Sequence, residues 1–92
     1  MTRDDIIQAI YHILKNKIEL PTIASFHEEA RLNEDLYMDS VMILELILFI
    51  ELDLGIKMPD EALSPNDFRT VGHLATFLER QHEKGVVVET HD

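Results

Sequence analysis

Residues 40–55 read SVMILELILFIELDLG, and this stretch decides the fold. Its main apolar row has the three- and four-residue spacing of an α-helix and comprises Ile43, Leu46, Ile47, Ile50 and Leu54. A second apolar row, Val41, Leu44 and Leu48, falls on another side of the same helix, with Glu45 beside it. A surface helix needs only one apolar stripe, so the second row is either buried or offered to a partner. Gly55 predicts the end of the helix.

A first helix is predicted from about residue 4 to residue 17. Thr2 is suited to cap it, with Asp5 three residues later as the capping-box partner. Two adjacent apolar rows give this helix a broad face to bury: Ile6, Ile10 and Ile13, and Ile7, Tyr11, Leu14 and Ile18. Pro21 prevents the helix from running further.

A long connection, residues 21–39, separates these two helices. A structureless loop of this length in a small domain is expected to be functional or pinned to the core. Ser25 followed by Glu28 predicts one short turn. Phe26, Leu32 and Leu36 are the expected anchors.

The chain after Gly55 predicts one more long helix. Residues 56–59 are expected to be extended, since a residue before proline avoids helical angles. Residues 60–63 predict a short additional helix and residues 64–67 a turn. Thr70 then caps a helix from Val71 to about Gln81, with Val71, Leu74, Ala75 and Leu78 as its buried stripe. We therefore expect an all-α bundle of three main helices plus a short one, in a single domain, 1–84, followed by a disordered tail, 85–92.

The charge of the chain lies mostly in its middle. The 92 residues carry a formal net charge of −10, and residues 21–67 hold 11 acidic and 2 basic side chains. Such a field repels nucleic acid and anionic lipid and attracts basic protein surfaces. Acids that only keep a small protein soluble are an open alternative.

Several features predict a cytoplasmic protein. There is no cysteine, no signal-peptide pattern follows Met1, and Glu45 and Glu51 interrupt the longest apolar stretch, residues 41–52, so it cannot span a bilayer. We expect a monomer that binds neither nucleic acid nor membrane. Because the chain begins with Met1, we also expect a free-standing product and not a fragment of a larger protein.

No pattern of catalytic or metal-ligating residues is found. The five histidines are scattered, and no two stand four residues apart, as a metal site on one helix requires. None of the three glycines builds a phosphate-binding loop, and no apolar pocket is evident to shift the pKa of the paired carboxylates. The sequence predicts no catalytic residue, no metal site and no enzyme activity.

The junction between the long loop and the dense helix is the remaining candidate site. Residues 35–40 read DLYMDS, so Ser40 stands at a helix N-terminus, where backbone N–H groups and the helix dipole favour an attached phosphate. The alternative is that Asp39 or Ser40 is only an N-cap. The acidic loop before Ser40 and the partner-like row after it favour a functional role.

At this point the chain resembles the acyl and aryl carrier proteins of fatty-acid, polyketide and nonribosomal-peptide biosynthesis. The family signature Asp-Leu-x-x-Asp-Ser-(Leu/Val) is matched by residues 35–41, and a Glu-Leu pair follows at the family spacing as Glu45-Leu46. Further matches in register are an acidic residue at Glu51, the run Met58-Pro59-Asp60-Glu61 and the pair Thr70-Val71.

The resemblance implies a carrier function. Ser40 would receive 4′-phosphopantetheine from coenzyme A through a phosphopantetheinyl transferase, with Asp39 in support, and acyl groups would be held on the arm as thioesters. The tether would raise the effective concentration of the intermediate at each partner enzyme. Those partners would be an acyl- or aryl-adenylating enzyme, a synthase or a synthetase. They would dock on a face formed by Val41, Leu44, Glu45, Leu48 and Glu51.

The chain departs from the family pattern near the serine. Tyr37 stands where the family usually has Gly, Met38 where it has a small residue, and Met42 where an acidic or polar residue is common. The combination of residues 35–37 with residues 40–42 resembles discrete aryl carriers of siderophore pathways of the petrobactin type. That resemblance implies a dihydroxybenzoyl cargo, loaded by an adenylating enzyme and passed to an amine by a synthetase.

Two other classes of function are weighed against the carrier. A non-enzymatic helical adaptor would bind a basic partner through the acidic, apolar helix 40–54, and it would give Ser40 no role. A small hydrolase or isomerase would need buried carboxylates in a cleft, which nothing in the sequence supports.

Overall fold

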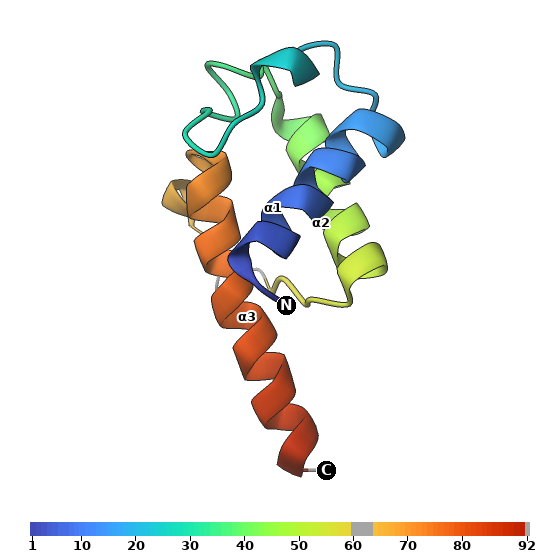
Figure 1. Cartoon of the computed structure of the whole chain (residues 1–92), viewed down its shortest axis with the longest axis vertical. Helices are drawn as coiled ribbons and strands as arrows, with labels where there is room; N and C mark the ends of the chain where they lie inside the picture. Colours follow the sequence, from blue (N-terminus) through green and yellow to red (C-terminus); the bar gives the residue numbers. More distant parts are fainter. Residues whose placement is uncertain (60–63, 92) are drawn as a thin grey trace.

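The computed structural model describes the backbone of residues 1–59 and 64–91 and the side chains of residues 1–59 and 64–83. Within this part of the chain the regular secondary structure is helical, apart from one isolated bridge between Arg31 and Thr70. Its three long helices are α1 (Arg3–His12), α2 (Ser40–Leu54) and α3 (Val71–His91). Shorter helical pieces are η1 (Ile13–Lys17), η2 (Ile23–Ser25) and η4 (Pro65–Phe68). The predicted all-α bundle of three main helices is confirmed (Figure 1).

The first helix begins at the predicted cap, but it ends in a π-turn that was not predicted. Thr2 and Asp5 form the capping box, with both reciprocal hydrogen bonds at 3.1 Å. The helix continues through η1 as a π-turn, in which the Ile18 N–H donates to the Ile13 carbonyl, five residues back, at 3.0 Å. Glu19 then takes a left-handed backbone, φ 56°, and turns the chain away before Pro21 is reached.

The core lies where the three helices face one another, with α1 crossing between α2 and α3 (Figure 1). Side chains from all three long helices are fully buried in it, as expected from their apolar rows. They include Ile6, Ile10 and Leu14 from the first helix, Leu46 and Ile50 from α2, and Val71, Leu74, Ala75 and Leu78 from α3. Ile56 and Met58, in the predicted extended segment, are also buried. The buried stripes predicted for the first and last helices are confirmed.

The long loop is pinned to the core, and its short helical turn lies earlier than predicted. The turn is η2, which ends at Ser25 and does not begin there, because the Phe26 N–H bonds back to Ile23 at 3.0 Å. Leu32 and Leu36 are fully buried and Phe26 is half-buried, so the three predicted anchors are confirmed.

Backbone hydrogen bonds attach this loop to the start of α3. The Val71 N–H donates to the Ala30 carbonyl at 3.0 Å, and the Gly72 N–H donates to the Glu28 carbonyl at 2.8 Å. A Cβ at Gly72 would lie 3.2 Å from that Glu28 oxygen and 3.3 Å from the Arg3 guanidinium. The loop can therefore approach α3 this closely because residue 72 has no side chain.

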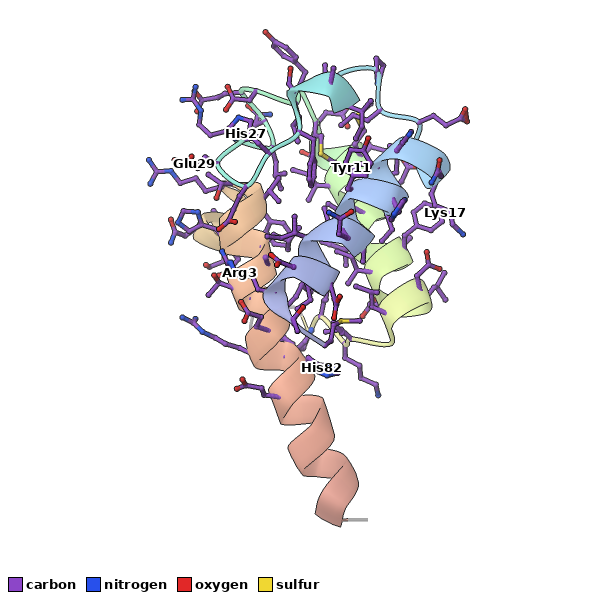
Figure 2. The ribbon with its side chains drawn as sticks, viewed as in Figure 1. Arg3, Tyr11, Lys17, His27, Glu29 and His82 are labelled. Carbon is purple, nitrogen blue, oxygen red and sulfur yellow. The ribbon has the colours of Figure 1, made fainter. Side chains whose placement is uncertain are left out.

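Arg3 joins three segments on the same side of the molecule (Figure 2). Its guanidinium donates to the Glu28 carboxylate at 3.0 Å, to the Glu79 carboxylate at 2.8 Å, to Thr76 Oγ1 at 2.9 Å and to the Gly72 carbonyl at 3.1 Å. Hydrogen bonds to the two carboxylates raise the pKa of Arg3 above its ordinary value.

The last helix is capped as predicted and is longer than predicted. Thr70 Oγ1 accepts from the His73 N–H at 3.0 Å. The backbone of α3 continues to His91, past the predicted end near Gln81, and its last turns project from the bundle (Figure 1). Gly85 does not end the helix, because one interior glycine costs only about 1 kcal/mol. The division into a domain, 1–84, and a tail, 85–92, stays a prediction, and the short helix predicted at residues 60–63 lies outside the described residues.

Candidate functional site

A tight turn at the end of the loop sets the direction of the chain toward α2. The Asp35 carboxylate accepts from the Arg31 backbone N–H at 2.8 Å and from Arg31 Nε at 3.1 Å. The Arg31 carbonyl in turn accepts from the N–H groups of Asp35 and Leu36, both at 3.0 Å. Hydrogen bonds from the Arg31 side chain and backbone lower the pKa of Asp35 below its ordinary value of 3.8. The first acid of the DLYMDS run therefore holds the loop closed.

The residues just before the candidate serine are clamped on both sides of Tyr37. Thr22 Oγ1 donates to the Leu36 carbonyl at 2.6 Å, and Asn33 Nδ2 donates to the Met38 carbonyl at 3.0 Å. The Leu36 and Met38 side chains are fully buried. Tyr37 between them has φ 55° and is 74% exposed. A left-handed backbone is costly for a residue with a Cβ, so this conformation is held by the contacts of its neighbours.

Asp39, and not Ser40, is the N-cap of α2. Its carboxylate accepts from the Met42 N–H at 2.9 Å, and its carbonyl accepts from the Ile43 N–H at 3.0 Å. Ser40 is the first helical residue and is exposed. In the described part of the chain its hydroxyl makes no hydrogen bond within the protein, and the N–H groups of Ser40 and Val41 are the free donors of the first turn.

The second apolar row of α2 is exposed. Val41, Leu44 and Leu48 are each more than half exposed, and Glu45 lies beside them in solvent. Leu52, one turn beyond Leu48, continues the same row and is 78% exposed. The main row faces the core instead. The molecule therefore presents a ridge of aliphatic side chains beginning next to Ser40, and we call Val41, Leu44, Glu45, Leu48 and Leu52 the exposed α2 face.

The sequence of the chain is similar to those of known carrier proteins. No family model matches the chain. An acyl carrier protein of Bacillus anthracis, AsbD, is 42% identical over 79 residues, which cover 86% of this chain and 87% of that protein. An acyl carrier protein of Treponema denticola is 31% identical over 80 residues, covering 87% of this chain and 99% of the relative. An acyl carrier protein of Saccharopolyspora erythraea is 34% identical over 74 residues, covering 80% of this chain and 75% of the relative.

The chain belongs to the acyl carrier proteins. Its role is that of a carrier, as the resemblance had implied. No helix in the residues that the structure describes is long and apolar enough to cross a membrane.

One predicted docking residue of this carrier protein has a structural contact. Glu51 is half-buried, and its carboxylate accepts from the Met58 N–H at 3.2 Å, which holds the chain after Gly55 against α2. The carboxylate of Asp53, also on α2, lies 3.8 Å from the Lys17 ammonium. The structure therefore groups Val41, Leu44, Glu45 and Leu48 and places Glu51 at the edge of the group.

Two exposed residues of the carrier protein were not predicted as part of its surface. Leu52 stands four residues after Leu48, so helical spacing alone would have found it. Tyr37 was recognised only as a departure from the family pattern. Its exposure depends on the burial of Leu36, which was predicted as an anchor, and on the burial of Met38, which was not predicted.

Proposed function

We propose that this carrier protein holds its acyl groups on a 4′-phosphopantetheine arm attached to Ser40 Oγ. The observation that carries the proposal is the division of roles at the start of α2. Asp39 caps the helix, so the exposed Ser40 hydroxyl remains available for modification. The free N–H groups of Ser40 and Val41 suit the negative charge of a phosphodiester at the positive end of the helix dipole.

The chain's own residues supply attachment and placement. Ser40 Oγ would form the new P–O bond to the phosphopantetheine phosphate of coenzyme A, with release of 3′,5′-ADP, and the transferase would take up the serine proton. When attached, the arm supplies a terminal thiol that holds the acyl group as a thioester. Asp39 would support the site by fixing the first turn of α2, as its bonds to Met42 and Ile43 indicate.

The partners of the loaded carrier would dock on the exposed α2 face. Its leucines offer apolar area for burial, and Glu45 offers a charge that steers a basic enzyme surface and raises the association rate more than the affinity. Glu51 would contribute charge from the edge of this face. We propose a phosphopantetheinyl transferase and an acyl- or aryl-adenylating enzyme, synthase or synthetase as partners. The carrier itself is a monomer and no enzyme in this proposal.

The proposed cargo is an aryl acid of the dihydroxybenzoyl type, for a siderophore pathway. The sequence around the serine, residues 35–37 and 40–42, supports this through its resemblance to siderophore-type aryl carriers. A cytoplasmic location fits the role, because coenzyme A, the donor of the arm, is an intracellular metabolite.

The first experiment is an intact-mass measurement on the native chain, Ser40→Ala and Ser25→Ala, after incubation with coenzyme A, magnesium and a broad-specificity phosphopantetheinyl transferase. We expect one phosphopantetheine on the native chain and on Ser25→Ala, and none on Ser40→Ala. Ser25 is a matched control because it is also exposed and lies in η2, outside α2. Ser40→Ala should keep a native circular dichroism spectrum, since its hydroxyl makes no described bond within the fold.

Failure of a folded native chain to accept the arm from more than one transferase would contradict the attachment. The alternative, an adaptor that uses the exposed α2 face without a cofactor, would then explain the same surface better. Unfolding of Ser40→Ala would mean that the serine mainly stabilises the helix start.

A further inference from the structure

Tyr37 has a combination of features that the fold does not require. Its ring is 74% exposed, although an exposed aromatic ring gains nothing from the core. Its backbone is held at φ 55°, in the left-handed region that disfavours side chains with a Cβ. Strained backbone of this kind persists where the surroundings over-determine it and is concentrated at functional sites.

The surroundings of Tyr37 do over-determine it. The Met38 N–H donates to the Leu32 carbonyl at 2.9 Å, and the carbonyls of Leu36 and Met38 accept from Thr22 and Asn33. With Leu36 and Met38 fully buried, the tyrosine between them must point outward. The ring is thus presented on a fixed backbone with two side-chain torsions left to order. Such aromatic groups make inexpensive interface anchors in terms of conformational entropy.

The position of Tyr37 determines which partner meets it. Tyr37 stands three positions before Ser40. Their Cα atoms are therefore at most about 11 Å apart, even if the chain between them is fully extended. An enzyme that modifies Ser40 Oγ must bring its own catalytic groups to that atom. A specific protein interface covers roughly 800 Å² of each partner, a patch much wider than this separation. An interface centred on Ser40 is therefore wide enough to include Tyr37.

Charge and surface continuity support the same occupant. Glu34, Asp35 and Asp39 lie within three residues of Tyr37, and Arg31 pairs with Glu34 at 2.7 Å and with Asp35 at 3.1 Å. Three acids against one base leave a net negative charge near the ring, which favours a basic partner surface. Beyond Ser40 the exposed α2 face begins at Val41, which is 65% exposed. Tyrosine is among the residues most often found as dominant contacts in interfaces.

We propose that the Tyr37 ring is a specificity-determining contact for the phosphopantetheinyl transferase, seated in an apolar recess on a basic surface of that enzyme. The inference rests on the proposed attachment of the arm to Ser40. In this proposal the ring acts in recognition by the transferase, before any cargo is present. The fold of the carrier does not depend on the ring.

The test compares variants that change the ring and spare the backbone. Tyr37→Asn removes the ring and keeps a residue that tolerates the left-handed conformation, whereas Tyr37→Phe keeps the ring. Glu19→Asn is the matched control, because Glu19 is also exposed and has nearly the same backbone, φ 56°, at the other end of the loop. KM and kcat for arm transfer from unacylated coenzyme A are measured with the broad-specificity transferase used for Ser40.

We expect Tyr37→Asn to raise KM for the carrier about tenfold with little change in kcat, since a lost docking contact removes binding common to ground and transition states. Tyr37→Phe and Glu19→Asn should match the native chain. A kcat/KM for Tyr37→Asn within twofold of native would overturn the inference while the attachment to Ser40 stands. An effect seen only with aryl-loaded coenzyme A would also overturn it, because the ring would then contact cargo. A native chain that is never loaded would instead refute the attachment itself.

Discussion

Asp39 and Ser40 have different roles at the start of α2: Asp39 caps the helix, and Ser40 presents an exposed hydroxyl. The Asp39 carboxylate satisfies the Met42 N–H, so the Ser40 hydroxyl has no structural duty in the described part of the chain. The neighbouring acid, Asp35, acts one step earlier by closing the turn with Arg31. Single residues therefore set the geometry of the candidate site through local hydrogen bonds.

The charge of Asp35 makes the turn before Ser40 sensitive to acid. Because hydrogen bonds from Arg31 hold the pKa of Asp35 below 3.8 in the folded chain, its stabilising contribution is fully present above that pH. The contribution is lost as the pH falls through the lower, folded-state pKa. We expect Asp35→Asn to lower the urea midpoint at neutral pH and to approach the native midpoint as the pH falls below about 4. A constant difference between the two chains from pH 7 to pH 3 would mean that the carboxylate charge has no part in the turn.

At the scale of the element, α2 is apolar on two sides and uses each side differently. The row with Leu46 and Ile50 is buried against the other helices, and the row with Val41, Leu44 and Leu48 lies in solvent. Apolar side chains exposed to water are unfavourable, and a contiguous row of them is typical of an interaction site. This is why we propose the row as a docking surface.

Leu48→Glu tests the exposed side of α2. Because Leu48 is 58% exposed, the change should leave the melting temperature within a few degrees of native. It should leave arm transfer to Ser40 largely intact. It should slow the transfer of an aryl group from an aryl-adenylating enzyme to the phosphopantetheine-bearing carrier about tenfold or more, because it places a charge where apolar area would be buried on docking. Ala24→Glu, which adds the same charge on exposed η2, is the control. Equal loss of both activities in a folded Leu48→Glu chain would contradict a docking role for this face.

At the scale of the whole molecule, Arg3 closes the bundle on the side of α3. It joins the start of α1 to the loop at Glu28 and to Glu79 on α3. These three segments are far apart in sequence, so the contact forms only in the complete fold.

Arg3→Met should lower the free energy of unfolding by about 1–2 kcal/mol, because several charge-assisted hydrogen bonds are lost at a side chain that is only partly exposed. Lys17→Met removes one exposed ion pair, spanning 3.8 Å to Asp53, and should cost about 0.5 kcal/mol or less. Urea unfolding of both variants measures the difference. If the two variants lose equal stability, the Arg3 contacts do not join the segments more strongly than an ordinary surface pair.

The sequence by itself determined the features that depend on neighbours within a turn or two. The capping box of Thr2 and Asp5, the start of α2 at Ser40 and its end at Gly55 follow from short-range hydrogen bonds and backbone preferences, and all three are confirmed. The two apolar rows of α2 follow from helical spacing. The DLYMDS run pointed to the carrier proteins through its resemblance to the signature of that family.

Only the tertiary structure decided which groups are hidden and which are presented. Whether the row of Val41 or the row of Leu46 is buried depends on where α1 and α3 pack. The attachment of the loop to Gly72 and the outward position of Tyr37 likewise arise from contacts between residues distant in the chain. Such contacts depend on burial and backbone strain in several segments at once, so they cannot be predicted from a short stretch of sequence.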